Sequence, residues 1–317
     1  MLIAIQLIAG IALLYYGAEW LVKGGAAIAM RLAIPPLIIG LTLVAFATSA
    51  PELVVSLKAA LSGFGDISIG NIVGSNICNI GLILGLAALI TPLAVQKQLL
   101  KTDVPLLIVI SFLLAIIGTL NDSIGWITGA FFVLLLISYI FYQVYAALKS
   151  GKINSAEAPD EVKKSLNIKL PIALLLVVFG LSALVGGAHL FVEGAVNIGK
   201  ALGVSEVVIG LTVVAIGTSL PELATSTVAA IRHEDEIAIG NVIGSNIFNI
   251  LGIIGVTTLV CPVPVSGLGW ADWSLMLLYT ILLYPLIRFS KNVNRIEGGA
   301  LLAIFASYMT WLVINAR

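Results

Sequence analysis

Residues 40–53 read GLTLVAFATSAPEL and residues 210–223 read GLTVVAIGTSLPEL, with ten of the fourteen positions identical. A second pair of stretches repeats at the same offset of 170. Residues 66–80 read DISIGNIVGSNICNI and residues 236–250 read EIAIGNVIGSNIFNI, identical at ten of fifteen positions. Because two long matches at one offset do not arise by chance, the chain is a duplicated unit.

The composition around these stretches indicates a membrane protein. Of 317 residues, 60% are hydrophobic and only 10% are charged, where a soluble domain carries roughly 25% charged residues. Too few polar groups are present to cover a soluble surface, and equal numbers of acidic and basic residues give no net charge. These features exclude a soluble enzyme, a disordered protein and a nucleic-acid-binding protein. The two cysteines, Cys78 and Cys261, form neither a metal-ligand spacing nor a disulfide framework.

The apolar runs predict an all-α polytopic membrane protein with ten transmembrane helices. Each run approaches or exceeds the ~20 residues that a membrane helix needs, and is far longer than the ~10-residue strands of a membrane barrel. The expected helices are 2–30, 36–62, 66–92, 102–119, 123–148, 168–199, 205–231, 236–261, 268–287 and 297–316.

The duplication divides these helices into two repeats of five. We expect a first repeat at 1–148, a cytoplasmic linker at 149–167 and a second repeat at 168–317. Because five is odd, the second repeat enters the membrane in the opposite orientation, which makes the repeats inverted. Inverted repeats are typical of secondary transporters, whose site lies near the bilayer midplane. Duplication kept for packing alone is the alternative, but the best-matched residues are polar ones in mid-helix.

The loops predict the orientation. With ten helices, twelve Lys and Arg residues fall on the side of the linker and three on the side of the termini. Since cytoplasmic loops carry the excess of basic residues, both termini are expected outside the cell.

The motif T-S-x-P-E occurs inside one helix of each repeat, at 48–52 and 218–222. A proline within a helix removes an N–H and displaces a carbonyl, so local unwinding is expected to turn backbone carbonyls into a cavity. A glutamate follows each proline, and a carboxylate at membrane depth costs several kcal/mol unless it is paired, protonated or bound to a cation. The residues concerned are the carbonyls of Ala45, Thr48, Ala215 and Thr218, and the carboxylates of Glu52 and Glu222.

The second motif, G-N-x-x-G-S-N-I-x-N, adds hydroxyl and amide oxygens. Ser75 and Asn79 are four residues apart and share a helix face, as do Ser245 and Asn249. An all-oxygen set suits hard cations such as Ca²⁺ and Na⁺. Two carboxylates balance one Ca²⁺ or two Na⁺, and competition for one such site produces antiport. The remaining asparagines are expected either to bond between helices or to border the site: Asn71, Asn76, Asn241 and Asn246.

These two motifs give the sequence a resemblance to the prokaryotic sodium/calcium exchangers of the cation/calcium antiporter superfamily, over essentially its whole length. The resemblance implies a multi-pass protein of the plasma (inner) membrane with ten helices and outward termini, in which the first and sixth helices slide to alternate access. It implies Glu52 and Glu222 as the principal Ca²⁺ ligands. It also implies flanking Na⁺ sites built from Thr48, Ser49, Thr218, Ser219, Ser75 and Ser245, with the carbonyls of Ala45 and Ala215.

One departure from the family concerns coupling. Some archaeal members and the potassium-dependent branch resemble this chain but carry Asp at the position of Asn249. The missing carboxylate argues against K⁺ co-transport. Members of the proton-coupled branch carry a glutamate after G-N-A. This chain instead has Asn-Ile-Val at 71–73 and Asn-Val-Ile at 241–243, which argues against H⁺ as the main coupling ion.

The function expected from these features is antiport of Na⁺ against Ca²⁺, with Ca²⁺ extruded by the Na⁺ gradient. The alternatives are a Ca²⁺/H⁺ or other divalent-cation antiporter of the same fold and, with less support, a cation channel. No nucleophile–base set or cofactor motif indicates an enzyme, so no prosthetic group is expected. The expected partners are the two ions and the lipid bilayer, without nucleic acid, and the protein is expected to work as a monomer.

Overall fold

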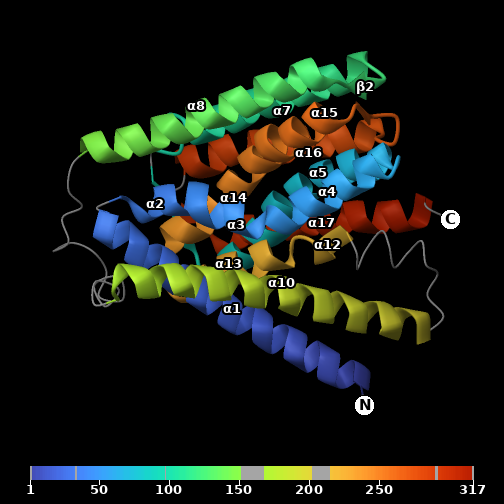
Figure 1. Cartoon of the computed structure of the whole chain (residues 1–317). Helices are drawn as coiled ribbons and strands as arrows, with labels where there is room; N and C mark the ends of the chain where they lie inside the picture. Colours follow the sequence, from blue (N-terminus) through green and yellow to red (C-terminus); the bar gives the residue numbers. More distant parts are fainter. Residues whose placement is uncertain are drawn as a thin grey trace.

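The computed structural model describes residues 2–32, 34–96, 98–150, 168–201, 215–289 and 292–315. These residues form an elongated bundle of helices, with α8 along one side and the crossing pair α1 and α10 along the other (Figure 1). The two ends of the described chain lie at the same end of the bundle.

The first half contains five long helical segments joined by short turns. In order, its elements are α1 (Leu2–Leu32), α2 (Pro36–Ile39), the π-helical η1 (Gly40–Val44), α3 (Ala45–Thr48), α4 (Ala50–Leu61), α5 (Gly65–Cys78), the π-helical η2 (Asn79–Leu84), α6 (Gly85–Ile90), β1 (Leu93–Ala94), α7 (Asp103–Leu120), β2 (Ser123–Ile124) and α8 (Trp126–Ser150).

The second half repeats this order where it is described. Its elements are α10 (Leu170–Ala201), α12 (Ala215–Gly217), α13 (Leu220–Ile231), α14 (Asp235–Phe248), the π-helical η4 (Asn249–Ile254), α15 (Gly255–Val260), β3 (Val263–Pro264), α16 (Trp270–Phe289), β4 (Asn292–Val293) and α17 (Arg295–Asn315).

The described helices agree with the helical membrane fold expected from hydropathy. Eight of them are long and apolar enough to cross a membrane, and the bent pair Pro36–Thr48 and Ala50–Leu61 makes a ninth span. The expected helix at 205–231 lies partly at residues 202–214, outside the described residues, so the count of ten stays a prediction. One boundary was wrong: Ser123 and Ile124 form strand β2 and not the start of a helix.

Glycines hold α1 and α10 against each other. A Cβ on Gly17 would come within 2.8 Å of the Gly180 carbonyl oxygen, and one on Gly10 within 3.0 Å of the Gly187 oxygen. Residue numbers rise along α1 as they fall along α10, so the two helices are antiparallel. Since α1 and α10 are related by the offset of 170, equivalent helices run in opposite directions.

Four short strands connect the two halves of the chain. β1 pairs antiparallel with β4, and β2 pairs antiparallel with β3. In the repeat, β1 corresponds to β3 and β2 to β4, so each pair joins one strand from either half. Such an exchange is what a pseudo-two-fold axis between the halves produces.

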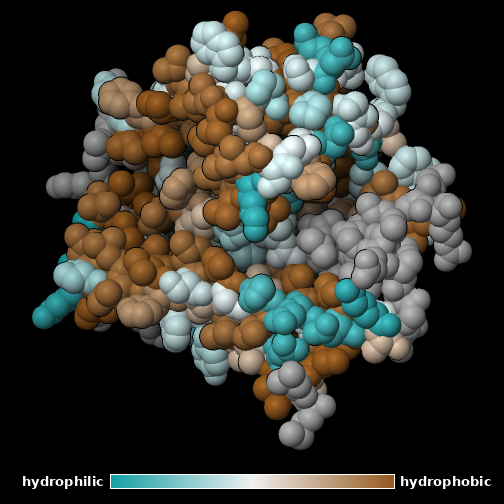
Figure 2. Space-filling model, turned by 45° about the vertical axis from the view of Figure 1, so that its right-hand side comes forward, coloured by the Kyte–Doolittle hydropathy of each residue, from teal (hydrophilic) through white to brown (hydrophobic). Residues whose placement is uncertain are grey.

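The two spans that carry the second motif form the centre of the bundle. Asp235–Val260 is the most deeply buried of the described spans, followed by Gly65–Ile90. Figure 2 shows a broad hydrophobic surface on one face of the molecule, with hydrophilic residues in smaller groups. Lipid solvates such a surface, whereas polar side chains in the central spans must find partners within the protein.

Candidate functional site

The proline motifs break their helices at the expected place. α3 ends at Thr48 and α4 begins at Ala50, with Ser49 between them in a non-helical conformation, and the axis bends by 43°. In the second half, Thr218 and Ser219 separate α12 from α13. Because a proline is tolerated in the first turn of a helix, each helix restarts around its proline. Glu52 and Glu222 therefore lie in the first turn of α4 and α13, at the positive end of the helix dipole.

Each of these glutamates is bound by the serine of the other half. Ser49 Oγ donates to Glu222 Oε1 over 2.9 Å, and Ser219 Oγ lies 3.3 Å from Glu52 Oε1. A serine at the start of a helix usually caps its own N–H groups, yet neither serine caps its own helix here. Each hydroxyl instead binds the glutamate of the other half, so the two proline motifs lie against each other and their carboxylates are close enough to interact electrostatically.

The second oxygen of each carboxylate is left without a hydrogen bond by the residues that the structure describes. Glu52 and Glu222 are each 1% exposed, and their Oε2 atoms accept no hydrogen bond among the described residues. Three further predicted site oxygens are buried and find no partner within the described segments: Ser245 Oγ, Asn79 Oδ1 and Asn249 Oδ1. An unsatisfied buried polar atom costs about 1–3 kcal/mol, and more when it is charged. Carboxylate, hydroxyl and amide oxygens of this kind are the ligands that hard cations prefer, so these residues are candidates for a cation site.

Two second-motif residues make hydrogen bonds between the halves, and one of them lies beside the serine that contacts Glu52. Ser75 Oγ lies 3.3 Å from Ser219 Oγ, the same hydroxyl that contacts Glu52. Asn249 Nδ2 donates to Asn76 Oδ1 over 3.0 Å, which leaves the Asn249 oxygen unpartnered. Ser75 and Asn249 are buried, so lipid does not reach them.

The two threonines of the proline motifs are held by asparagines. Thr48 Oγ1 donates to Asn241 Oδ1 over 3.1 Å, and Thr218 Oγ1 to Asn71 Oδ1 over 3.2 Å. Of the two alternatives expected for the four asparagines, bonding between helices holds for Asn71, Asn76 and Asn241, whereas Asn246 donates to Val242 O within its own helix. That Asn71 and Asn241 hold the threonines was not predicted, although each follows a glycine at the equivalent position of its repeat. The amide groups in turn donate to serines: Asn71 to Ser56 (3.0 Å) and Asn241 to Ser226 (2.9 Å).

The two alanine carbonyls are placed differently. Ala45 O accepts from the Ser49 backbone N–H over 3.0 Å and from Thr48 Oγ1 over 3.3 Å. It therefore closes the last turn of α3 beside the site. Ala215 is the first residue of α12 and directly follows residues 202–214, which lie outside the described residues.

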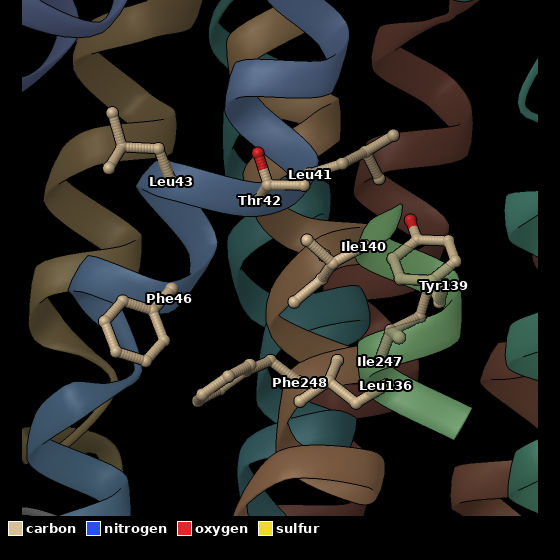
Figure 3. A pocket seen from close by; sticks show the side chains of 10 residues that line it. Leu41, Thr42, Leu43, Phe46, Leu136, Tyr139, Ile140, Ile247 and Phe248 are labelled. Carbon is tan, nitrogen blue, oxygen red and sulfur yellow. The ribbon is translucent and has the colours of Figure 1, made fainter. Parts of the chain in front are cut away.

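A separate apolar pocket lies outside this cluster. It has a volume of about 290 Å³ and opens between α3, α8 and α14, where Phe46, Ile140 and Phe248 surround it (Figure 3). Its lining is almost wholly apolar, and Phe46 is half exposed. Its only polar side chains are the hydroxyls of Thr42 and Tyr139, which makes it a poorer candidate for a cation site than the buried carboxylates.

The fold and the buried oxygen cluster define a helical membrane transporter for hard cations. The sodium/calcium exchanger protein family matches residues 2–145 and 172–314, and the chain belongs to this family. It is 40% identical to the putative antiporter CaxA of Alkalimonas amylolytica, covering 97% of this chain and 98% of that protein. It is 33% identical to the sodium/calcium exchanger MaX1 of Methanosarcina acetivorans, covering 96% and 97%.

A solved structure agrees with the fold. The sodium-calcium exchanger NCX_Mj, soaked with Na⁺ and Sr²⁺, superimposes with a TM-score of 0.83 at 36% identity, covering 100% of this chain and 99% of the other. The protein is therefore a multi-pass cation/calcium antiporter and not an enzyme. Proteins of this family transport Na⁺ and Ca²⁺ without a prosthetic group.

Proposed function

We propose that the protein exchanges Na⁺ for Ca²⁺ by alternating access and that the Na⁺ gradient drives Ca²⁺ out of the cell. The observation that carries the proposal is the carboxylate pair of Glu52 and Glu222, buried at 1% exposure, whose Oε2 atoms have no hydrogen-bond partner in the part of the chain that the structure describes. At an effective dielectric constant of ~20, two charges 4 Å apart repel by about 4 kcal/mol. A cation between the carboxylates relieves that repulsion.

Coupling follows from charge balance. One Ca²⁺, or two Na⁺, neutralises the pair, and the two occupancies compete for the same oxygens. An empty site leaves bare carboxylates at membrane depth, which is costly, so the unloaded site does not change its access. We propose that Glu52 and Glu222 bind Ca²⁺. We further propose that the flanking oxygens of Thr48, Ser49, Ser75, Asn79, Thr218, Ser219, Ser245 and Asn249, with the Ala45 and Ala215 carbonyls, serve Na⁺.

The same proposal includes the organisation of the chain. The halves 1–148 and 168–317 are taken as inverted repeats of five helices, joined by a cytoplasmic linker, in a prokaryotic inner membrane with both termini outside. The antiparallel pair α1 and α10 and the strand exchange support inverted repeats. Each half supplies one glutamate and one serine to the site, so a monomer holds a complete site.

The test is Ca²⁺ uptake into proteoliposomes. Vesicles loaded with Na⁺ are diluted into Na⁺-free buffer containing radioactive Ca²⁺, beside vesicles loaded with K⁺. We expect uptake only with internal Na⁺. Uptake that follows a pH gradient without Na⁺ would replace the proposal with Ca²⁺/H⁺ exchange, and uptake that needs no counter-ion would indicate a channel.

A further inference from the structure

In each proline motif, the threonine lies beside an asparagine from the other half of the chain. Thr48 Oγ1 is 3.1 Å from Asn241 Oδ1, and Thr218 Oγ1 is 3.2 Å from Asn71 Oδ1. Thr48 and Asn241 are fully buried, so water does not compete for their polar atoms. The direction of the hydrogen bond therefore decides whether the threonine offers its hydrogen or its oxygen lone pairs to the site.

The backbone of Glu222 fixes the orientation of the Asn241 amide. Asn241 Nδ2 lies 3.4 Å from the backbone oxygen of Glu222 and 2.9 Å from Ser226 Oγ. Because a backbone oxygen only accepts hydrogen bonds, the amide nitrogen, which donates them, faces it. The amide oxygen then faces Thr48, and it too only accepts. The hydroxyl hydrogen of Thr48 is consequently donated to Asn241.

The Thr48 hydroxyl is surrounded by acceptors. Besides Asn241 Oδ1, the backbone oxygen of Ala45 lies 3.3 Å from Thr48 Oγ1, and the carboxylate of Glu222 is a third neighbour. A threonine hydroxyl carries one hydrogen and two lone pairs. When the hydrogen is donated to Asn241, the lone pairs are left toward the other oxygens, and a cation between them relieves the repulsion. Such a cation gains the Thr48 oxygen as a ligand.

The same contact occurs in the other half with less burial. Asn71 Nδ2 donates to Ser56 Oγ over 3.0 Å, and Asn71 Oδ1 accepts from Thr218. Asn71 and Thr218 are half-buried, whereas Asn241 and Thr48 are fully buried. The chain thus holds two copies of one arrangement in different packing environments, so an effect found at both belongs to the hydrogen bond and not to the packing around it.

We propose that Asn71 and Asn241 are positioning residues that hold the threonine hydroxyls as acceptors for Na⁺, an inference that rests on the proposed exchange of Na⁺ for Ca²⁺. Each asparagine takes the hydroxyl hydrogen of its threonine, so Thr48 and Thr218 present oxygen to the ion site. Neither asparagine is itself a ligand. Both affect Na⁺ binding, because a hydroxyl that pointed its hydrogen into the site would repel a cation there.

The test is a double-mutant cycle on the full-length protein in detergent. The readout is the Na⁺ concentration that displaces half of the bound radioactive Ca²⁺, which requires no transport. Thr48→Val removes the hydroxyl and keeps the shape of the side chain, and Asn241→Leu removes its acceptor. We expect this concentration to rise about tenfold in Thr48→Val and about fivefold in Asn241→Leu, the latter corresponding to the ~1 kcal/mol of one hydrogen bond.

Coupling between the two substitutions distinguishes a positioning role from a structural one. If Asn241 acts through the Thr48 hydroxyl, its replacement has no further effect once that hydroxyl is gone, and the double variant stays at about tenfold. Independent effects would multiply to about fiftyfold, and that result would overturn the proposal. In Thr48→Ser, which keeps the hydroxyl, Asn241→Leu should again raise the Na⁺ concentration about fivefold.

A crossed pair of substitutions is the matched control for this cycle. Thr218 donates to Asn71, whereas Asn241 accepts from Thr48, so the effects of Thr218→Val and Asn241→Leu should multiply. A crossed pair coupled as strongly as the contacting pair would overturn the proposal. If Asn241→Leu does not fold, Asn71→Leu with Thr218→Val provides the same cycle at the half-buried copy.

Thr280→Val controls for the loss of a buried hydroxyl. Thr280 donates to Met276 O within its own helix α16, so its replacement should leave the half-displacing Na⁺ concentration unchanged. A rise as large as that in Thr48→Val would show that the readout responds to any buried hydroxyl and would overturn the proposal.

Flux of Ca²⁺ against a Na⁺ gradient is measured on the same variants in proteoliposomes. The expected coupling in a protein that shows no such flux would remove the proposed exchange and keep the positioning role. Normal flux with multiplying effects would remove the positioning role and keep the exchange. Wild-type protein whose bound Ca²⁺ is not displaced by Na⁺ would overturn both.

Discussion

Ser49 donates its hydroxyl hydrogen to Oε1 of Glu222 over 2.9 Å, from one half of the chain to the other. The reciprocal contact places Ser219 Oγ 3.3 Å from Oε1 of Glu52. Both serines occupy helix starts without capping them. The lost caps are worth about 1 kcal/mol each. In return, Oε1 of each carboxylate is fixed, whereas Oε2 has no partner among the described residues.

Replacing either glutamate with glutamine should abolish exchange. Glu52→Gln or Glu222→Gln removes one of two negative charges that attract a divalent ion at a desolvated site. We expect Ca²⁺ flux in proteoliposomes to fall by at least about 100-fold. Elution as a monodisperse species in size-exclusion chromatography shows that the variant is folded. Near-normal flux in either variant would remove that glutamate from the site.

Replacing either of the two serines that bind the glutamate of the other half should weaken Ca²⁺ binding by about the same amount. Ser49→Ala and Ser219→Ala each remove a hydrogen bond to a buried carboxylate, worth about 1.5–3 kcal/mol. We therefore expect the half-saturating Ca²⁺ concentration to rise roughly tenfold or more in each. Ser138→Ala is the control, because that exposed hydroxyl only donates to Leu134 O in α8. An effect of Ser138→Ala as large as that of the site serines would contradict a specific role.

Changing the flanking oxygens should alter ion preference and leave exchange possible. Asn249→Asp adds a third carboxylate and removes the amide that donates to Asn76, so we expect a steeper dependence on Na⁺. Ser75→Ala removes a hydroxyl beside Ser219 and should raise the half-saturating Na⁺ concentration. Both are measured as Ca²⁺ flux against internal Na⁺. If neither dependence changes, these residues lie outside the ion site.

The close contact of α1 with α10 should not tolerate side chains. In Gly17→Ala or Gly180→Ala, the new methyl group would lie 2.8 Å or less from backbone atoms of the other helix. Such overpacking typically costs about 1–3 kcal/mol, so we expect lower thermal stability in detergent together with reduced flux. Gly186→Ala lies on the same helix α10 with nothing within 4 Å of the added methyl and should be tolerated. Equal losses in all three variants would indicate a helix-wide effect.

Much of the fold could be predicted from hydropathy and the repeat. The described long helices begin and end within three residues of their expected positions, because each apolar segment partitions into lipid by its own composition. The short strands were not predicted, since two-residue strands leave almost no pattern in a sequence. Residues 202–214 fall within an expected helix and outside the described residues, so that helix remains a prediction.

The candidate site was predicted in its residue types but not in its pairings. Chemistry and spacing singled out Glu52 and Ser75 from one half and their equivalents from the other. The partner of Ser49 could not be predicted, since the local rule for a serine at a helix start favours its own backbone. The different partners of Asn76 and Asn246 were also hidden, because the two residues occupy identical motifs.

The sequence by itself determined that the protein is a helical membrane protein, that its unit is duplicated, and which polar residues interrupt its apolar segments. These properties depend on local composition and on a match between two parts of the chain. Only the tertiary structure decided that Ser49 binds Glu222 and that Ser219 contacts Glu52. It also decided that Asn76 accepts a hydrogen bond from the other half, whereas Asn246 donates within its own helix. The shared motif letters are the same in both halves, so they do not distinguish the partners, which depend on how the halves pack against each other.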